Sequence, residues 1–258
     1  MKILFIGDIV GRCGIDAVFE KVYDLKEKYG IDFCIANCEN AAGGFGITRE
    51  ILEDLKRAGV DAFTGGNHIF SQKNNLKVFD DIEFDIVRPY NLPGANPGRG
   101  ATVVTAKCGK KIGIINLLGN LYMNDSTGNV FEFAENAIDE IKDRADIIII
   151  DVHAEATSEK KALGYYLDGK VGAVFGTHTH IQTADEQIFE GGTAYITDAG
   201  MCGAKNSVLG AEIKTAIAKF ISKEKVHYKG ADGEKIFCGV IIDVDDDGKA
   251  TDIKRIRI

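Results

Sequence analysis

Short apolar runs alternate with amphipathic stretches over the first part of this chain, and this alternation limits the fold more than any other feature. Three runs are typical of buried strands: Lys2 to Ile6, Phe33 to Ala36 and Val60 to Phe63. Two intervening stretches have helical patterning: Asp16 to Tyr29, ended by Gly30, and the segment from a Thr48 N-cap to Ala58, ended by Gly59. Parallel strands need such crossover connections, so this order predicts an α/β protein with a sheet that is at least partly parallel.

The rest of the chain adds strands and helices to this beginning. Four runs have the composition of strands: Ala101 to Ala106, Lys111 to Asn116, Ile147 to Ile150 and Val171 to Phe175. The first two flank a short turn and predict a hairpin, Phe131 to Asp143 predicts a helix, and Ile236 to Val244 and Lys249 to Ile258 predict strands around a turn. At 258 residues with 45% hydrophobic composition the chain can bury a full core, so we expect residues 1–258 to form a single domain.

Charge and cysteine content limit the partners and the location of the protein. A formal net charge of −8 without a concentrated basic cluster disfavours extended nucleic acid, although metal ions can still hold a small anionic substrate. The six cysteines include no C-x-x-C pair and most stand in apolar runs, so we interpret them as reduced and buried, which favours the cytoplasm. Asp8 ends the N-terminal apolar run early, and we expect neither a signal peptide nor a membrane partner. The oligomeric state stays open.

Four of the five histidines stand just after predicted strands. His68 is in Gly-Gly-Asn-His, His153 follows an isoleucine run, and His178 and His180 are in Gly-Thr-His-Thr-His. In an extended segment residues i and i+2 share a face, so the last two are expected to offer both imidazoles to one point. Imidazole is a common metal ligand, and this placement favours a metal site over four unrelated histidines. His227, in a polar stretch, is interpreted as incidental.

Acidic and amide side chains occupy positions like those of the histidines. Asp8 follows the first predicted strand, Glu39 and Asn40 follow the second, and Asn67 follows the third. Ligands in open α/β sheets gather beyond the carboxyl ends of strands, so we expect these groups and the histidines to converge. Oxygen and imidazole ligands without sulfur suit Fe, Mn or Zn, and seven of them exceed the needs of one tetrahedral ion. The pattern predicts two divalent or mixed-valence metal ions bridged by a carboxylate.

Three other motifs have simpler interpretations. Residues 7 to 14 lack the G-x-G spacing of a dinucleotide loop, and Asp8 would repel a pyrophosphate there. Residues 43 to 46 resemble a phosphate cradle but lack Gly-Lys-Ser/Thr, which favours a plain loop without excluding the cradle. Residues 243 to 248 begin like a calcium loop, but Lys254 replaces the twelfth-position glutamate, which favours a β-turn.

All three prolines fall between Pro89 and Pro97, which predicts an irregular loop. We interpret this loop as a candidate rim over the site. Groups suited to one nucleotide stand at Arg88, Tyr90, Asn91, Asn96 and Arg99. A solvated loop explains the same composition equally well.

The order and spacing of the motifs resemble the calcineurin-like metallophosphoesterases over residues 7 to 180. The features that carry the resemblance are an early Gly-Asp, a Gly-Asn-His, an isolated histidine after a strand and a late Gly-x-His-x-His. With Gly-Asp-Ile-Val-Gly-Arg, Asn-x-Glu-Asn and Asp198-Ala-Gly-Met-x-Gly203, nearly the whole chain looks like the bacterial YmdB-type subfamily. The resemblance implies a four-layer α/β sandwich, in which two mixed β-sheets are flanked by helices.

The resemblance also implies site residues and a reaction. One metal would take Asp8, Glu39, Asn40 and His180, and the other would take Glu39, Asn67, His153 and His178, with His68 unligated beside them. The wider family has Asp-x-His in its first motif, but Val10 stands at that histidine, so Asn40 is expected to supply the missing ligand. The implied enzyme is a dinuclear phosphodiesterase that hydrolyses small cyclic nucleotide phosphodiesters, especially 2′,3′-cyclic ones. A metal-bridged hydroxide would attack, and His68 would act as the acid.

Two other functions remain open from the sequence. Another metal-dependent hydrolase, such as an amidohydrolase, can use His-x-His, although that fold usually carries the motif after an early barrel strand and here it lies late. The second is a regulatory nucleotide- and metal-binding protein with weak turnover. His68 is present, and every expected ligand position has a residue that can bind a metal. This argues against an inactive site, but it does not show how fast the protein turns over a substrate.

Overall fold

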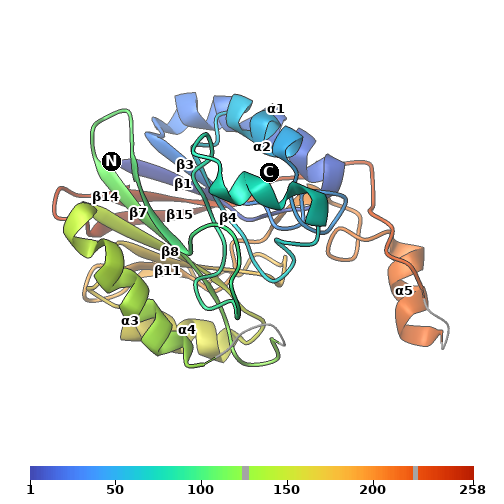
Figure 1. The fold of residues 1–258 in the computed structure, drawn as a ribbon. Helices are drawn as coiled ribbons and strands as arrows, with labels where there is room; N and C mark the ends of the chain where they lie inside the picture. Colours follow the sequence, from blue (N-terminus) through green and yellow to red (C-terminus); the bar gives the residue numbers. More distant parts are fainter. Residues whose placement is uncertain (124–127, 223–225) are drawn as a thin grey trace.

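Two six-stranded mixed sheets pack face to face in the computed structural model, which describes residues 1–123, 128–222 and 226–258 (Figure 1). In spatial order, the first sheet contains β15 (Ala250–Arg257), β14 (Cys238–Val244), β1 (Lys2–Ile6), β3 (Phe33–Asn37), β4 (Ala62–Thr64) and β5 (Ile86–Val87). The second contains β10 (Gln187–Ile188), β11 (Ala194–Ile196), β9 (Ala173–Thr177), β8 (Ile147–His153), β7 (Lys111–Leu118) and β6 (Ala101–Thr105). A small third sheet joins β13 (Lys235–Ile236), β12 (Met201–Ala204) and β2 (Asp8–Ile9).

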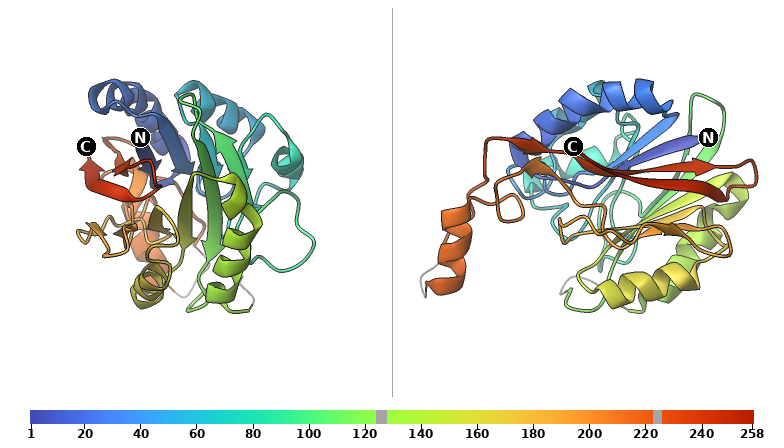
Figure 2. Two further views of the ribbon diagram at one scale, coloured as in Figure 1. Left: turned by 90° about the vertical axis from the view of Figure 1, so that its left-hand side faces the viewer. Right: turned by 180° about the vertical axis from the view of Figure 1, so that it is seen from behind.

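Helices cover the outer faces of both large sheets (Figures 1 and 2). The first sheet is covered by α1 (Gly11–Tyr29) and α2 (Arg49–Arg57), and the second by α3 (Val130–Ile141) and α4 (Thr157–Tyr166). Short 3-10 turns, η1 (Lys73–Asp80) and η2 (Lys142–Arg144), complete these layers. The arrangement confirms the expected four-layer sandwich of two mixed sheets between helices.

One further helix, α5 (Ile213–Ile221), stands away from the four layers (Figure 1). None of its residues is buried. Among the described helices, none combines the length and the apolar character that a membrane crossing requires.

Side-chain alternation along the strands builds three separate hydrophobic cores. In β1, Ile3 and Phe5 face the second sheet, whereas Leu4 and Ile6 face the helices α1 and α2. Successive side chains of a strand point to opposite faces, so a strand that is covered on both faces must be apolar throughout. The continuous apolar runs of the sequence therefore correspond to strands buried in the middle layers.

The first helix begins earlier than the sequence predicts. We expected it to start at Asp16, but α1 starts at Gly11. Glycine is a poor helix former, so the segment with Gly11 and Gly14 favoured a loop. Packing overrides this preference, because a Cβ on Gly14 would lie 2.3 Å from the Cys202 carbonyl oxygen of β12.

The second helix has the predicted cap, whereas the third strand is displaced. Thr48 is the N-cap of α2, and its side chain accepts a hydrogen bond from the Ile51 N–H. The predicted strand from Val60 to Phe63 is wrong at its start, since β4 begins at Ala62. The Val60 N–H still bonds to the Leu55 carbonyl and closes the end of α2.

The C-terminal half confirms some predictions and corrects others. The hairpin of β6 and β7 is antiparallel as predicted, and residues 245–248 form a turn. The predicted strand from Ile236 to Val244 is interrupted at Phe237, since β13 and β14 belong to different sheets. All six cysteines are free thiols, but Cys108 in the hairpin turn is exposed, contrary to expectation. The sequence pattern did not predict α4, α5, β2, β5, β10, β11 and β12.

Candidate metal centre

The polar side chains predicted as ligands lie where strand ends of the two large sheets meet. Asp8 follows β1, Glu39 and Asn40 follow β3, and Asn67 follows β4, all in the first sheet. The second sheet brings His153, the last residue of β8, and the residues after β9. Side chains from both sheets therefore converge on one region, as expected for the carboxyl ends of α/β strands.

Four ligand atoms form a tight group around the imidazole of His153. Its Nε2 atom lies 3.1 Å from Glu39 Oε1, 3.1 Å from Asn67 Oδ1 and 3.0 Å from His178 Nδ1. Glu39 and His153 are buried. Ligand atoms about 2.1 Å from one ion are separated by roughly 3.0 Å when they are neighbours in a coordination shell. The spacing of these atoms therefore fits a shared metal ion.

A second, looser group lies beside the first. Asn40 Oδ1 is 3.2 Å from His180 Nε2, and Asp8 Oδ1 is 3.8 Å both from His180 Nε2 and from His153 Nδ1. Asp8 is fully buried, yet its Oδ1 atom accepts no hydrogen bond from any residue that the structure describes. Buried carboxylate oxygens normally have partners, so this atom fits a cation. Val10 packs in a small apolar cluster and offers no ligand.

A glycine leaves room for the tight group. A Cβ on Gly66 would lie 2.2 Å from Glu39 Oε2 and 2.5 Å from His153 Nε2. No side chain fits at that distance. The Gly-Gly-Asn-His motif thus brings its backbone against the cluster, while Asn67 points into the cluster.

His68 lies beside the cluster and remains partly accessible to solvent. Its backbone N–H donates to Glu39 Oε2 over 2.9 Å, while its ring packs edge-on against Phe45 at 4.9 Å between centroids. The ring Nε2 atom is 3.4 Å from Asn67 Nδ2. His68 is therefore held next to the ligand atoms, and its imidazole is not part of the tight group.

The two histidines of Gly-Thr-His-Thr-His reach the site in a way that the sequence analysis did not predict. The strand β9 ends at Thr177, and His178 and His180 have φ angles of 95° and 64°. The segment is therefore a left-handed turn and not an extended strand, so the expected i, i+2 geometry is wrong. The rings point to different partners: His178 contacts His153, and His180 contacts Asn40.

A buried ion pair supports this turn. Lys160 of α4 donates from Nζ to the Thr177 carbonyl over 2.6 Å and to Asp198 Oδ2 over 2.9 Å. Asp198 Oδ2 also accepts from the backbone and the hydroxyl of Thr179. Asp198 stands in a motif that the sequence singled out, but the role of Lys160 was missed because a lysine on a helix normally indicates a solvent-exposed face.

A second network orients the His153 ring. Thr177 Oγ1 lies 2.9 Å from His153 Nδ1 and donates to Asp151 Oδ1 over 2.7 Å. The other Asp151 oxygen accepts from Asn37 Nδ2 over 2.9 Å and from the hydroxyl of Thr64. Fixing Nδ1 in this way directs Nε2 toward Glu39, as outer partners of metal-binding histidines do. Thr177 and Asn37 stand in the quoted motifs Gly-Thr-His-Thr-His and Asn-x-Glu-Asn, but their role in orienting His153 was not predicted.

Burial and charge set the proton affinities in the cluster. Burial opposes a charge on His153, but Glu39 and Asp8 raise the pKa of its imidazole to about 9. Burial favours a neutral Glu39, yet His153 lowers the pKa of this carboxyl to about 2. Burial and the charge of His153 lower the pKa of His178 to about 3. The positive charge of protonated His153 thus balances the negative charge of Glu39. A bound cation would take the place of that proton.

In the proline-containing loop, three of the five side chains considered for nucleotide binding have partners within the protein. Asn91 is buried and exchanges two hydrogen bonds with the backbone of Leu118. Tyr90 bonds to Glu140 of α3, and Arg99 pairs with Asp85. These three contacts fix the loop to neighbouring elements, and the interpretation of the loop as a rim over the site stays a prediction.

Comparisons with known proteins match most or all of this chain. A family model described as YmdB-like protein matches residues 4–256. The 2′,3′-cyclic-nucleotide 2′-phosphodiesterase of Bacillus subtilis (strain 168) is 47% identical over 259 residues, which cover 100% of this chain and 97% of that protein. A solved structure of a novel phosphatase from Mycoplasma pneumoniae matches with a TM-score of 0.93 at 38% identity, covering 100% and 93% of the two chains. A hypothetical protein from Thermus thermophilus gives a TM-score of 0.92 at 35% identity, with 100% and 99% coverage.

Proposed function

The chain belongs to the YmdB-like protein family of phosphoesterases, and on this basis we propose that it hydrolyses small cyclic nucleotide phosphodiesters with two bound metal ions. Nucleoside 2′,3′-cyclic phosphates are the preferred substrates in this proposal. The name of the Bacillus subtilis relative supports this substrate class. The observation that carries the metal requirement is the group of ligand atoms spaced 3.0–3.1 Å around His153 Nε2.

The donor set divides into two overlapping groups. Glu39, Asn67, His153 and His178 would hold one ion, and Asp8, Glu39, Asn40 and His180 would hold the other. We assign Glu39 to both groups, as the resemblance to the calcineurin-like metallophosphoesterases implies, and oxygen and imidazole ligands suit Fe, Mn or Zn. Metal ions in such a pair supply a hydroxide at neutral pH and neutralise charge on the phosphoryl oxygens. The unpaired Oδ1 atom of Asp8 supports the second position.

Side chains of the protein protonate the leaving group and orient the predicted metal ligands. His68 is anchored through its backbone to Glu39, so its accessible imidazole lies beside the place of the phosphate. From there it protonates the leaving sugar oxygen, which assists departure of that group. Thr177 and Asp151 keep the His153 ring in one orientation.

Charge and ring strain favour small cyclic substrates over long polyanions. A protein with a net charge of −8 lacks the many basic contacts that hold an extended nucleic acid. A five-membered 2′,3′-cyclic phosphate is strained, and its leaving oxygen stays tethered to the sugar. Two ions and one acid therefore suffice to open it.

Two further parts of the proposal concern the chain as a whole. We infer that residues 1–258 fold as one domain, because the two large sheets share the core between them. We also assign the protein to the cytoplasm, since all six cysteines are free and five of them are buried: Cys13, Cys34, Cys38, Cys202 and Cys238.

A hydrolysis panel with the metal-loaded protein tests the proposed function. We expect turnover of 2′,3′-cyclic AMP that depends on Mn²⁺ and that chelation abolishes. Binding of the nucleotide under saturating Mn²⁺ without product would contradict catalysis and favour a regulatory nucleotide-binding protein. Turnover of amides in place of phosphodiesters would instead favour another metal-dependent hydrolase.

A further inference from the structure

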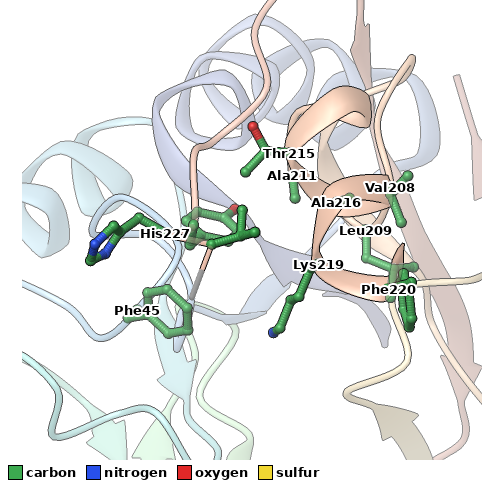
Figure 3. Close-up of a pocket in the computed structure, with 11 residues that line it drawn as sticks. Phe45, Val208, Leu209, Ala211, Thr215, Ala216, Lys219, Phe220 and His227 are labelled. Carbon is green, nitrogen blue, oxygen red and sulfur yellow. The ribbon is translucent and has the colours of Figure 1, made fainter. Parts of the chain in front are cut away.

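An apolar pocket of about 230 Å³ opens beside the candidate metal centre (Figure 3). Its walls come from three parts of the chain: the loop at Phe45, the segment from Val208 to Ala211, and α5 together with residues 226–228. The lining includes Phe45, Leu209, Thr215, Lys219, Phe220 and Tyr228. The proposed catalytic role does not use this pocket, the glycine-rich loop or His227.

Two of these three walls contact predicted metal ligands. On one side, Asn40 Nδ2 donates to the Gly44 carbonyl over 2.9 Å, and the next residue is Phe45. On the other side, the Leu209 carbonyl lies 3.1 Å from His180 Nδ1. The ring of Phe45 also packs against the ring of His68. A ligand in the pocket is therefore adjacent to both the metal centre and the proposed acid.

The aromatic wall is held in place before a ligand arrives. Phe45 packs edge-on against Tyr228, with 5.0 Å between the ring centroids. The Tyr228 hydroxyl donates to the Gly210 carbonyl over 3.3 Å, and Gln72 donates to the Phe45 carbonyl over 2.8 Å. Gly44 lies directly under the tyrosine, since a Cβ at this position would approach the ring within 2.5 Å. The absence of a side chain at Gly44 thus allows the loop of residues 43–46 to pack under the Tyr228 ring.

The size and polarity of the pocket fit one heterocyclic ring system. Drug-sized ligands occupy pockets of roughly 300–1,000 Å³, so a space of about 230 Å³ admits a base but not a whole dinucleotide. Besides Tyr228, the lining residues that the structure describes include only three polar side chains, those of Thr215, Lys219 and His227. In Figure 3 the Lys219 side chain extends from α5 toward the side of Phe45.

We propose that this pocket binds the nucleobase of the substrate while the phosphate lies at the metal centre. Phe45 and Tyr228 provide aromatic surfaces for the base, and α5 closes the opposite side. Bases of any sequence stack on aromatic side chains, so the pocket selects nucleoside phosphodiesters over phosphodiesters that lack a base. The assignment of the phosphate rests on the proposed function, whereas the base pocket can be tested without metal or turnover.

A binding experiment tests the pocket directly. The chain contains no tryptophan, so Phe220→Trp places a single indole reporter at the pocket. Titration of the metal-free protein with adenosine should change the fluorescence in a saturable way. Adding Tyr228→Ala should weaken adenosine binding by roughly 5- to 100-fold, the loss expected for one base–aromatic contact. The matched control is Tyr23→Ala, which removes an exposed tyrosine of α1 outside the pocket and should leave binding unchanged. A titration without a saturable change would overturn the proposal.

A kinetic experiment separates base binding from the reaction. The two substrates are 2′,3′-cyclic AMP and the 2′,3′-cyclic phosphate of a methyl riboside, which has no base. Tyr228→Ala should raise KM for the first substrate about 10-fold and lower kcat/KM for the second substrate by a much smaller factor. Tyr228 is the informative position because Phe45 also contacts His68. An equal loss on both substrates would overturn the pocket assignment.

The two proposals can fail separately. Hydrolysis of both substrates at equal kcat/KM, without saturable adenosine binding, would refute the base pocket and leave the phosphodiesterase function intact. Adenosine binding that depends on Tyr228, in a protein that hydrolyses no phosphodiester, would support the pocket and refute the proposed function.

Discussion

The amino group of Lys160 lies 2.9 Å from Asp198 Oδ2, and both side chains are about 1% exposed. This pair joins α4 to the segment after β11, and its other hydrogen bonds fix Thr177 and Thr179. Those two threonines flank His178, whose positive φ angle is unfavourable for a residue other than glycine. The ion pair thus holds the turn that presents His178 and His180.

Removing one charge of this pair should therefore destabilise the protein strongly. We expect Lys160→Met to lower the free energy of unfolding by about 3–5 kcal/mol, because Asp198 would be left buried without its cation. Lys205→Met is the matched control, since Lys205 forms an exposed pair with Glu234 and should change the free energy by less than about 1 kcal/mol. Urea unfolding of both variants provides the measurement. Similar values for the two would show that the buried pair does not support the turn.

Gly66 should be essential for metal retention. In Gly66→Ala the added methyl group would overlap Glu39 and His153, so both side chains must move away from the ligand positions. Gly203→Ala is the control, because a Cβ there meets its nearest neighbour at 3.5 Å, an ordinary contact distance. Elemental analysis after metal loading should find fewer ions in Gly66→Ala and an unchanged content in the control. Full metal content in both variants would contradict the tight packing at Gly66.

Glu39 and Asn67 should differ in how many ions their loss affects. Glu39→Ala should lose both ions together, because we assign this carboxylate to both groups of ligands. Asn67→Ala and Asn40→Ala should each weaken chiefly one ion, at the His153 side and at the Asp8 side respectively. Isothermal titration of the metal-free variants with Mn²⁺ reports the stoichiometry. A wild-type protein that takes up at most one ion per chain after careful loading refutes the dinuclear assignment.

His68 should act in the reaction and not in metal retention. Its imidazole lies outside the tight group, and only its backbone N–H contacts Glu39. His68→Ala keeps that backbone contact, so the variant should retain its ions while kcat falls by roughly 10²- to 10⁴-fold. The rate and the metal content are measured on the same sample. Loss of an ion from His68→Ala would instead make His68 a ligand.

The sequence could predict which polar side chains come together because these residues follow apolar runs along the chain. A polar residue soon after a buried strand is a local signal, and it singled out Asp8, Glu39 and Asn67 as candidate ligands. The supporting residues gave no comparable signal, since their roles depend on contacts between segments that are far apart in sequence. Lys160 resembles a surface residue of a helix until the fold places it against Asp198.

The fold was predictable to a similar extent and for similar reasons. The middle-layer strands are largely apolar, so the pattern predicted strands in a sheet that is at least partly parallel, whereas the two mixed sheets were expected only from the family resemblance. Short strands such as β2 and β12 were missed because two to four residues give no periodicity. The positive φ angles of His178 and His180 could not be predicted, because only the surrounding hydrogen bonds make such a turn stable.

Substrate choice provides the last prediction: small cyclic phosphodiesters should be cleaved faster than long RNA. Binding of a polyanion depends on many basic contacts, and a net charge of −8 disfavours them. The ligand atoms are also deeply placed, since Asp8 and His153 are fully buried. A single strained cyclic phosphate can approach such a centre, whereas a structured RNA must first unfold to present one linkage. We therefore expect a higher kcat/KM for 2′,3′-cyclic AMP than for 3′,5′-cyclic AMP, and the lowest value for a structured RNA, when all are measured at one salt concentration. A rate on the RNA that equals or exceeds the rate on every small diester would make the protein a nuclease.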